Sequence, residues 1–359
     1  MYLAVRTDGS NSIRSILVRA PNWIGDAVLC LPAIEALQSA YPQSEITVLA
    51  KPWVGPVFLN NPFVKGIIYY DSLEKHGGII GKWRLIKDIR GCHFDMAVLF
   101  QNAFEAALII FLAGIPQRIG YSMDLRGVFL TQPIKLTPDI KRTHQVFYYL
   151  NIMTAGSGDR GQWTGDKIRP KLYLTDKEKE YAKRILKSKG VAENNIIIGV
   201  APGASYGPAK RWMTDRFREV AKRFIRNYGA KIIVFGGKDD SGICKSVLND
   251  SEGLNLAGKI DLRESIALMH KCNLFITNDS GPMHIAAALG IPTVAIFGST
   301  DPSLTGSIGD KVVVIKKGIE CSPCFERVCK YGHYNCFKMI AVDDVYEASI
   351  RLIKEFANA

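Results

Sequence analysis

Residues 277–284 read Thr-Asn-Asp-Ser-Gly-Pro-Met-His, a polar turn between two apolar runs. The run before it, residues 273–276, is predicted to be a buried strand, and the run after it, residues 285–289, the first turns of a buried helix. Such a turn leaves backbone N–H groups free at a helix N-terminus, where partial positive charge favours phosphate. The residues placed to contact a diphosphate are Asp279, Ser280, Gly281 and His284.

The size and charge of the chain narrow the classes of protein it can belong to. At 359 residues it exceeds one typical core and suits two domains. Its formal net charge of +12 favours acidic partners, namely nucleic acid, an anionic lipid surface or a phosphorylated substrate. Because the basic residues are spread along the chain and no nucleic-acid-binding motif is visible, we expect phosphorylated substrates and no nucleic acid.

The distribution of apolar residues bears on where the protein works. No secretory signal is visible, since Arg6 and Asp8 stand where an apolar segment would be required. The longest uncharged apolar run, residues 106–115, is about half of what spans a bilayer. We therefore expect a cytoplasmic protein that touches a membrane surface peripherally.

Apolar runs alternate with helix-like segments along the chain. Strands are predicted at residues 15–18, 45–50, 66–70, 95–100, 195–200, 231–235, 274–277 and 293–297. Helices are predicted at residues 26–40, 54–59, 83–89, 103–113, 175–188, 214–228, 241–248, 262–270, 283–289 and 342–356. This alternation is typical of parallel sheets covered by helices on both faces.

The pattern stops and restarts around a Gly-rich stretch, residues 156–165, which is predicted to be a loop or linker. We therefore expect two Rossmann-like, doubly wound α/β domains, residues 1–165 and 166–359, with the last helix free to pack back on the first domain. Because ligands bind at the carboxyl ends of the strands in such sheets, we expect a ligand cleft between the domains.

The turn after the first predicted strand carries Gly25 and Asp26 at a helix start. Two interpretations of Asp26 stay open. It is either an N-cap, a position that Asp often takes, or a general base at the ligand-binding end of the sheet. The turn is no dinucleotide fingerprint, since it lacks the G-x-G-x-x-G pattern.

Two stretches of the second domain also follow predicted strands. Residues 201–212 combine Gly, Ser and Pro with Lys210. They form either a loop over a diphosphate, in which the lysine stabilises the leaving group, or an ordinary solvated basic loop. Residues 235–240 end in two acidic residues, of which we interpret Asp239 as an N-cap and Asp240 as an acceptor for ribose hydroxyls.

Four of the eight cysteines lie close together in the sequence. They are Cys321, Cys324, Cys329 and Cys336. Four neighbouring thiols can hold Zn²⁺ or an iron–sulfur cluster, although this spacing matches no standard ribbon or ferredoxin pattern. Free or redox-labile thiols are the alternative, since a reducing cytosol disfavours disulfides.

A dispersed basic and aromatic set in the first domain has two interpretations. It either grips an anionic acceptor or consists of ordinary surface residues. The set is Arg118, Tyr121, Arg126, Lys141, Arg142 and His144.

Three of these motifs, in this order, resemble the lipopolysaccharide heptosyltransferases of glycosyltransferase family 9, and the resemblance covers nearly the whole chain. Residues 16–26, Ile-Leu-Val-Arg-Ala-Pro-Asn-Trp-Ile-Gly-Asp, resemble the opening motif of the family. Residues 201–212 resemble its donor loop. Residues 277–284, with Gly-Ser-Thr-Asp-Pro at residues 298–302, resemble its diphosphate-binding signature.

The resemblance implies a GT-B fold, with two facing Rossmann-like domains, and an inverting reaction that needs no metal or other cofactor. The donor would be ADP-heptose, and the acceptor the phosphorylated lipid A–core at the inner face of the inner membrane, which would receive L-glycero-D-manno-heptose as its second heptose. Asp26 would be the general base, and Lys210 would contact the leaving phosphate. The donor would be held by Ser205, Asp240, Asp279, Ser280, Gly281 and His284, and the acceptor by Arg118, Tyr121, Arg126 and His144.

Two other classes of protein fit the same two-domain pattern. A related enzyme acting on another nucleotide sugar, including an epimerase, would convert its substrate without an acceptor. A non-catalytic carbohydrate-binding protein would tolerate the loss of Asp26. The three motifs in order favour the transferase.

Overall fold

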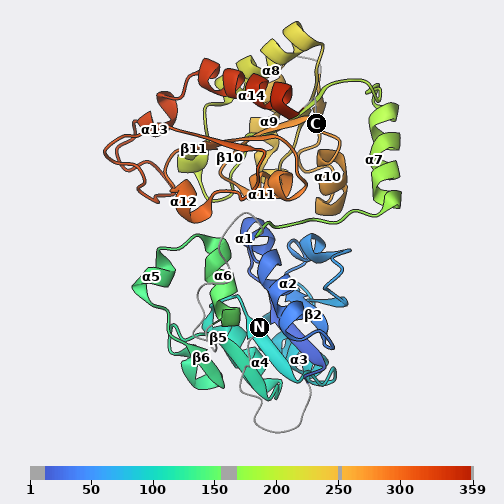
Figure 1. Cartoon of the computed structure of the whole chain (residues 1–359), viewed down its shortest axis with the longest axis vertical. Helices are drawn as coiled ribbons and strands as arrows, with labels where there is room; N and C mark the ends of the chain where they lie inside the picture. The colour runs from blue at the N-terminus through green and yellow to red at the C-terminus, as the bar shows by residue number, and fades with distance from the viewer. Residues whose placement is uncertain (1–12, 155–167, 250–252, 357–359) are drawn as a thin grey trace. The chain divides into compact units, whose positions relative to one another are not determined.

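The computed structural model describes residues 13–154, 168–249 and 253–356. The chain divides into two compact units, Met1–Tyr173 and Leu174–Ala359 (Figure 1). The Gly-rich stretch predicted to be a linker, residues 156–165, lies outside the described residues.

The first unit is built on a six-stranded parallel sheet with strand order β3-β2-β1-β4-β5-β6. Its strands are β1 (Ser15–Arg19), β2 (Glu45–Ala50), β3 (Gly66–Tyr69), β4 (Met96–Leu99), β5 (Gln117–Tyr121) and β6 (Gln132–Ile134). Its helices are α1 (Ile24–Leu29), α2 (Leu31–Ala40), η1 (Gly55–Phe58), α3 (Gly78–Arg90), α4 (Phe104–Leu112), η2 (Arg126–Phe129), α5 (Pro138–Lys141) and α6 (Gln145–Thr154).

The second unit repeats this plan, with parallel strands in the order β12-β11-β10-β7-β8-β9. Its strands are β7 (Ile197–Ala201), β8 (Lys231–Val234), β9 (Leu254–Asn255), β10 (Leu274–Asn278), β11 (Thr293–Phe297) and β12 (Val312–Lys316). Its helices are α7 (Asp176–Ser188), η3 (Pro208–Lys210), α8 (Thr214–Tyr228), η4 (Lys238–Asp240), α9 (Ser241–Leu248), α10 (Leu262–Met269), α11 (Gly281–Ala288), α12 (Pro302–Thr305), α13 (Asn335–Lys338) and α14 (Val342–Phe356).

Each sheet changes the direction of its strand order once. This switch lies between β1 and β4 in the first unit and between β7 and β10 in the second. The central strands β4, β7, β10 and β11 are buried along their whole length, as expected for strands covered on both faces. The prediction of two doubly wound α/β units is therefore confirmed, and the loops that follow the switch-point strands are where ligands bind in such sheets.

The strands that sequence patterns missed are β5, β6, β9 and β12. Three of them are short or only partly buried strands toward the sheet edges, so they lack a continuous apolar run. β5, Gln-Arg-Ile-Gly-Tyr, begins with two polar residues, so it also lacks a continuous apolar run. The remaining strands lie within two residues of their predicted bounds.

The helix predicted at residues 26–40 is two helices. α1 ends at Leu29 and α2 begins at Leu31, with Cys30 between them and Pro32 in the first turn of α2. Proline has no N–H for the preceding turn and fits only the start of a helix, which explains the break. The N-cap of α1 is Trp23, so the interpretation of Asp26 as an N-cap is wrong.

In the second unit, α7 begins with a capping box, in which Thr175 and Glu178 each bond the backbone of the other. The terminal helix α14 packs on α8 and on strands β10 to β12 (Figure 1), and its Val345, Ala348 and Leu352 join the core of the second unit. The helix proposed as free to pack on the first domain thus belongs to the second sheet.

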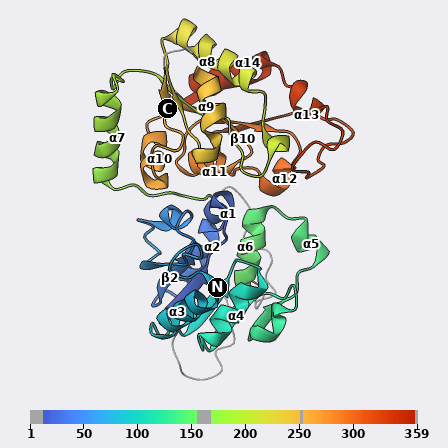
Figure 2. The same cartoon turned by 180° about the vertical axis from the view of Figure 1, so that it is seen from behind.

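On the first unit, α3 and α4 lie side by side (Figure 2) and share a buried cluster with Leu85, Ile89 and Ile110. Every helix within the described ranges is too short or too polar to cross a membrane.

Candidate functional site

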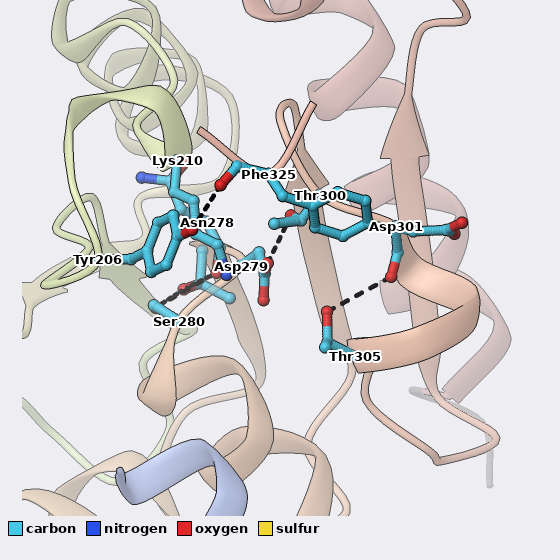
Figure 3. Close-up of polar contacts among 10 residues, drawn as sticks. Tyr206, Lys210, Asn278, Asp279, Ser280, Thr300, Asp301, Thr305 and Phe325 are labelled. Atoms are coloured by element: carbon cyan, nitrogen blue, oxygen red, sulfur yellow. Dashed lines mark hydrogen bonds and ion pairs between the residues drawn. The ribbon is translucent and has the colours of Figure 1, made fainter. Parts of the chain in front are cut away.

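The donor candidates of the second unit meet at its switch point. The loop after β7 carries Lys210, and the turn after β10 carries Asp279. The Lys210 Nζ lies 2.6 Å from the Asp279 Oδ2, and the Thr300 hydroxyl donates to the same oxygen at 2.6 Å. Figure 3 shows Thr300 turned toward this carboxylate. Asp279 is 4% exposed, so this ion pair is largely withdrawn from water.

Asn278 fixes the two loops to each other. Its side-chain amide donates to the Pro202 carbonyl at 2.7 Å and accepts from the Trp212 N–H at 3.0 Å. The whole residue is buried. A buried amide that satisfies a carbonyl of one loop end and an N–H of the other holds the loop over residues 202–212 in register with β10. Sequence analysis did not assign this residue.

The first turn of α11 follows Asp279 directly. Ser280 occupies its N-cap position in extended backbone, Pro282 stands in the first turn, and the Ser280 side chain caps none of the backbone groups in the described chain. Its hydroxyl lies instead 3.3 Å from the Thr277 Oγ1. His284 is buried one turn in, with Nδ1 3.2 Å from the Ser307 hydroxyl. The Ser280 side chain therefore does not cap the N-terminus of α11, and anion binding at this helix end stays a prediction.

Asp240 lies against the same loop. Its carboxyl group fills the space beside Gly203, where an added Cβ would approach to 2.3 Å. It accepts from the Gly237 N–H at 3.2 Å and lies 4.0 Å from the Arg211 guanidinium. Ser205 is exposed on the loop. The structure therefore brings Lys210, Asp240 and Asp279 to one edge of the second sheet.

The loop over residues 202–212 contacts the cysteine-rich segment, residues 321–336. No sequence pattern indicated this contact. The Tyr206 hydroxyl donates to the Phe325 carbonyl (Figure 3), and the Ala209 N–H donates to the Arg327 carbonyl at 3.0 Å. The Tyr206 ring also faces two cations, the Lys210 Nζ at 4.9 Å and the Arg327 guanidinium at 5.3 Å. Tyr206 thus links Lys210 to residues far along the chain.

The catalytic candidate of the first unit stands at its own switch point. Asp26 is in the first turn of α1, just after β1, and its Oδ1 lies 3.3 Å from the Tyr149 hydroxyl of α6. Burial raises the pKa of Tyr149 well above its usual range, and the Asp26 charge raises it further. Tyr149 therefore stays protonated and can donate a hydrogen bond to the carboxylate.

Three of the four acceptor candidates are engaged inside the first unit. Arg126 is fully buried and donates to the Tyr121 and Gln101 carbonyls. Tyr121 is also buried, and its hydroxyl donates to the Tyr148 carbonyl at 2.7 Å. Arg118 donates to carbonyls of residues 115, 116 and 129. These donors hold β5 and η2 in place, which gives the three side chains a structural role.

His144, the fourth acceptor candidate, lies at the start of α6. Its Nδ1 accepts from the Val146 N–H at 3.3 Å, a local contact of the kind that orders a helix start. The four candidates therefore do not converge on one open site within the first unit. Their dispersed spacing in the sequence carried no geometric information about burial.

A basic group that sequence analysis missed lies at the carboxyl edge of the first sheet. Lys51 directly follows β2, is 7% exposed, and places its Nζ 3.6 Å from the centre of the Tyr70 ring. Burial, reinforced by the nearby Arg19 charge, lowers the pKa of Lys51 to about 8. The Tyr70 hydroxyl donates to Glu105, which also pairs with Lys82. The only sequence signal for Lys51 was its position directly after a predicted strand, residues 45–50.

The four clustered cysteines surround one small cavity together with Ser299 and Ala209. All four are free thiols. Burial raises the pKa of Cys336. Burial also acts to raise the pKa of Cys329, but backbone N–H groups of residues 331–334 outweigh it, so that pKa lies below its ordinary value. Within the described ranges, no three His, Cys, Asp or Glu side chains already stand in an arrangement that would hold a metal ion.

Two doubly wound units, with a polar turn and a helix N-terminus at the switch point of the second, define a glycosyltransferase of the GT-B class. Sequence comparison gives the family. The model described as "Glycosyltransferase family 9 (heptosyltransferase)" matches residues 82–335, and the chain belongs to this family.

The relatives agree with this assignment. The chain is 32% identical to lipopolysaccharide heptosyltransferase 2 of Escherichia coli K12, over 84% of this chain and 87% of the relative. The solved structure of E. coli ADP-heptose lps heptosyltransferase II is similar, with a TM-score of 0.81 and 28% identity over 96% of this chain and all of that one. A family 9 glycosyltransferase from Veillonella parvula DSM 2008 gives a TM-score of 0.86 at 26% identity, over 97% and 99% of the two chains.

Proposed function

We propose that this enzyme transfers L-glycero-D-manno-heptose from ADP-heptose to the inner-core oligosaccharide of lipopolysaccharide, adding the second heptose. The observation that carries the proposal is the Lys210–Asp279 pair at the N-terminus of α11. It supplies a cation, a carboxylate and free helix-end N–H groups at one edge of a sheet, which suits a sugar joined to a diphosphate. The names of the relatives support heptose and ADP as its two halves.

In this proposal the second unit holds the donor. The backbone at Ser280 and Gly281 and the side chain of His284 cradle the diphosphate, with Ser205 on the exposed loop. Asp279 contacts the heptose, and Asp240 accepts from the ribose hydroxyls. Lys210 and the helix end stabilise the negative charge that grows on ADP as the glycosidic bond breaks.

Asp26 is the proposed general base of the first unit. It removes the proton of the acceptor hydroxyl as that oxygen attacks the anomeric carbon, which inverts the β-linked donor to an α-linked product. The Tyr149 hydroxyl, 3.3 Å from the carboxylate, orients it. The acceptor oligosaccharide is anionic, so the buried Lys51 and Arg19 at the same sheet edge supply complementary charge.

Because the proposed acceptor is attached to lipid A, we further propose that the enzyme works from the cytoplasm at the inner face of the inner membrane. Exposed apolar side chains of α3 and of the turn before it support this. Leu73, Ile79 and Ile80 are 82%, 77% and 71% exposed, and Trp83 follows one turn along α3. Exposed Arg84, Lys87 and Arg90 stand on the same helix. Apolar side chains beside cations suit an anionic lipid surface.

The deciding experiment measures ADP release with ADP-heptose, and with UDP- and GDP-sugars, each with and without heptosyl-Kdo₂-lipid A. Release that requires both ADP-heptose and this acceptor is expected. Conversion of a nucleotide sugar without any acceptor would instead indicate an epimerase, and tight donor binding without turnover would indicate a carbohydrate-binding protein. Vesicle flotation tests the membrane proposal, since a doubly substituted Ile79→Ser, Ile80→Ser variant should lose binding to phosphatidylglycerol vesicles while Tyr228→Ser retains it.

A further inference from the structure

Residues 321–336 are here called the cysteine loop. Its four cysteines converge on a space the size of one ion. The cavity that they line has a volume of about 20 Å³, room for a single water-sized sphere. Such a space is too small for a nucleotide or a sugar. It fits one metal ion, and thiolates are the ligands that soft divalent metals prefer.

The lining of the cavity contains a buried polar group without a hydrogen-bond partner in the described residues. Ser299 is 1% exposed, and its hydroxyl has no hydrogen-bond partner among the described residues. A buried hydroxyl without a partner is costly, and a thiolate bound to a metal would accept a hydrogen bond from it.

The charge of the surrounding loop is also complementary. Four thiolates and one divalent cation carry a net charge of 2−, and Arg327 and Lys330 stand in the same loop. His333 also lines the cavity, with its Nε2 4.0 Å from the Cys321 sulfur. Cations beside a set of cysteines favour the thiolate form that binds metal.

The cysteine loop is fastened to the donor side of the second unit at several points. The Ser322 hydroxyl donates to the Gly298 carbonyl at 2.6 Å, and the N–H groups of Cys324 and Phe325 donate to the Ser299 carbonyl at 3.0 and 2.8 Å. Its other side accepts from Tyr206 and Ala209 of the loop that carries Lys210. Whatever fixes the cysteine loop therefore also fixes the loop of Lys210.

We propose that Cys321, Cys324, Cys329 and Cys336 bind one thiophilic divalent metal ion of the zinc class, which staples the cysteine loop against the donor loop. Rotation about the Cα–Cβ bonds turns the four sulfurs into the cavity that they already line. Each thiol releases its proton as its sulfur binds, so four protons leave and no electron is transferred. The ion is structural, because four protein sulfurs leave no open position for a substrate.

The test begins with the full chain purified under reducing conditions without an affinity tag that binds metal. Elemental analysis is expected to find about one zinc or iron ion per chain. After removal of the ion, Co²⁺ titration should give sulfur-to-cobalt charge-transfer bands and tetrahedral d–d absorption that saturate at one equivalent. Cys324→Ser and Cys329→Ser should each lose stoichiometric binding, whereas Cys92→Ser, which removes an exposed thiol of the first unit, should retain it.

Several results would overturn the proposal. They are the absence of both bound metal and a cobalt–thiolate spectrum in folded protein, a disulfide within the cluster in protein taken from a reducing cytosol, and acid-labile sulfide, which would indicate an iron–sulfur cluster. If the serine variants fail to fold, thiol alkylation of the unaltered chain decides. The four cluster thiols must then be protected by Zn²⁺ and become reactive when a chelator removes it. None of these readouts depends on the sugar or the acceptor.

Discussion

The Lys210 ammonium lies 2.6 Å from the Asp279 carboxylate, and this pair joins the loops that follow β7 and β10. The two side chains are 14% and 5% exposed. Neither charge can be removed alone without leaving the other one unpaired in a poorly solvated site. The pair therefore holds the two loops together and also sets the charge of the site.

Replacing one member of this pair should be worse for stability than replacing both. We expect Lys210→Met or Asp279→Asn to lower the free energy of unfolding by about 3 kcal/mol, because a buried charge loses its partner. The double variant should recover part of that loss but should not recover ADP affinity. Urea unfolding and calorimetric ADP titration of the four proteins measure both quantities. Additive losses of stability would show that the two charges do not depend on each other.

Asp26 should matter for turnover and not for donor binding. We expect Asp26→Asn to lower kcat about 10²–10⁴-fold, the usual contribution of a general base. ADP affinity should stay the same, since Asp26 lies on α1 of the first sheet and the donor residues lie on the second. Glu35→Gln on α2 is the matched control, because it removes an exposed carboxylate. Substantial turnover by the Asp26 variant would refute its role as base.

Asn278 should be a stability residue as well as a site residue. Asn278→Ala leaves the Pro202 carbonyl and the Trp212 N–H without their partner. Each unsatisfied buried group costs about 1–3 kcal/mol, so the melting temperature should fall by several degrees. Asn227→Ala, at an exposed hydrogen bond to Tyr346, is the control and should have little effect. Equal shifts in the two variants would contradict the bridging role.

Lys51 should make stability rise with pH in the alkaline range. Its pKa is about 8 in the folded chain, whereas an unperturbed lysine has a pKa of 10.5. Between these two values the unfolded chain still holds a proton that the folded chain has released, so raising the pH favours folding. Below pH about 8 both states hold the proton and the effect is absent. In urea unfolding, the free energy of unfolding of the unaltered chain should rise relative to that of Lys51→Met from pH about 8 upward. A constant difference would refute the lowered pKa.

The local sequence was sufficient to predict the two α/β units and the turn at residues 277–284. Apolar runs of about four to six residues that alternate with helical patterns predicted two doubly wound sheets, because buried parallel strands must be apolar on both faces. The position of Asp279 directly after such a run placed it at the ligand edge of its sheet. The resemblance of three motifs gave the family. Membership in glycosyltransferase family 9 agrees with it.

The sequence did not show which side chains are buried and bonded internally. Arg118, Tyr121 and Arg126 were grouped as acceptor residues, yet their donors are taken by carbonyls around β5 and η2. β5 begins with polar residues, so no apolar run revealed that it was a strand. Lys51 was overlooked for the complementary reason, since its lowered pKa comes from burial and from Arg19, which lies on another strand.

The sequence by itself determined the fold class, the family and the turn at residues 277–284, because each depends on the order of nearby residues. Only the tertiary structure decided that Lys210 pairs with Asp279, that Asn278 bridges two loops, and that four cysteines line one cavity with Ser299. These contacts join segments far apart in the chain. They form where parallel strands end at the same sheet edge, and no local pattern of residues records which loops meet there.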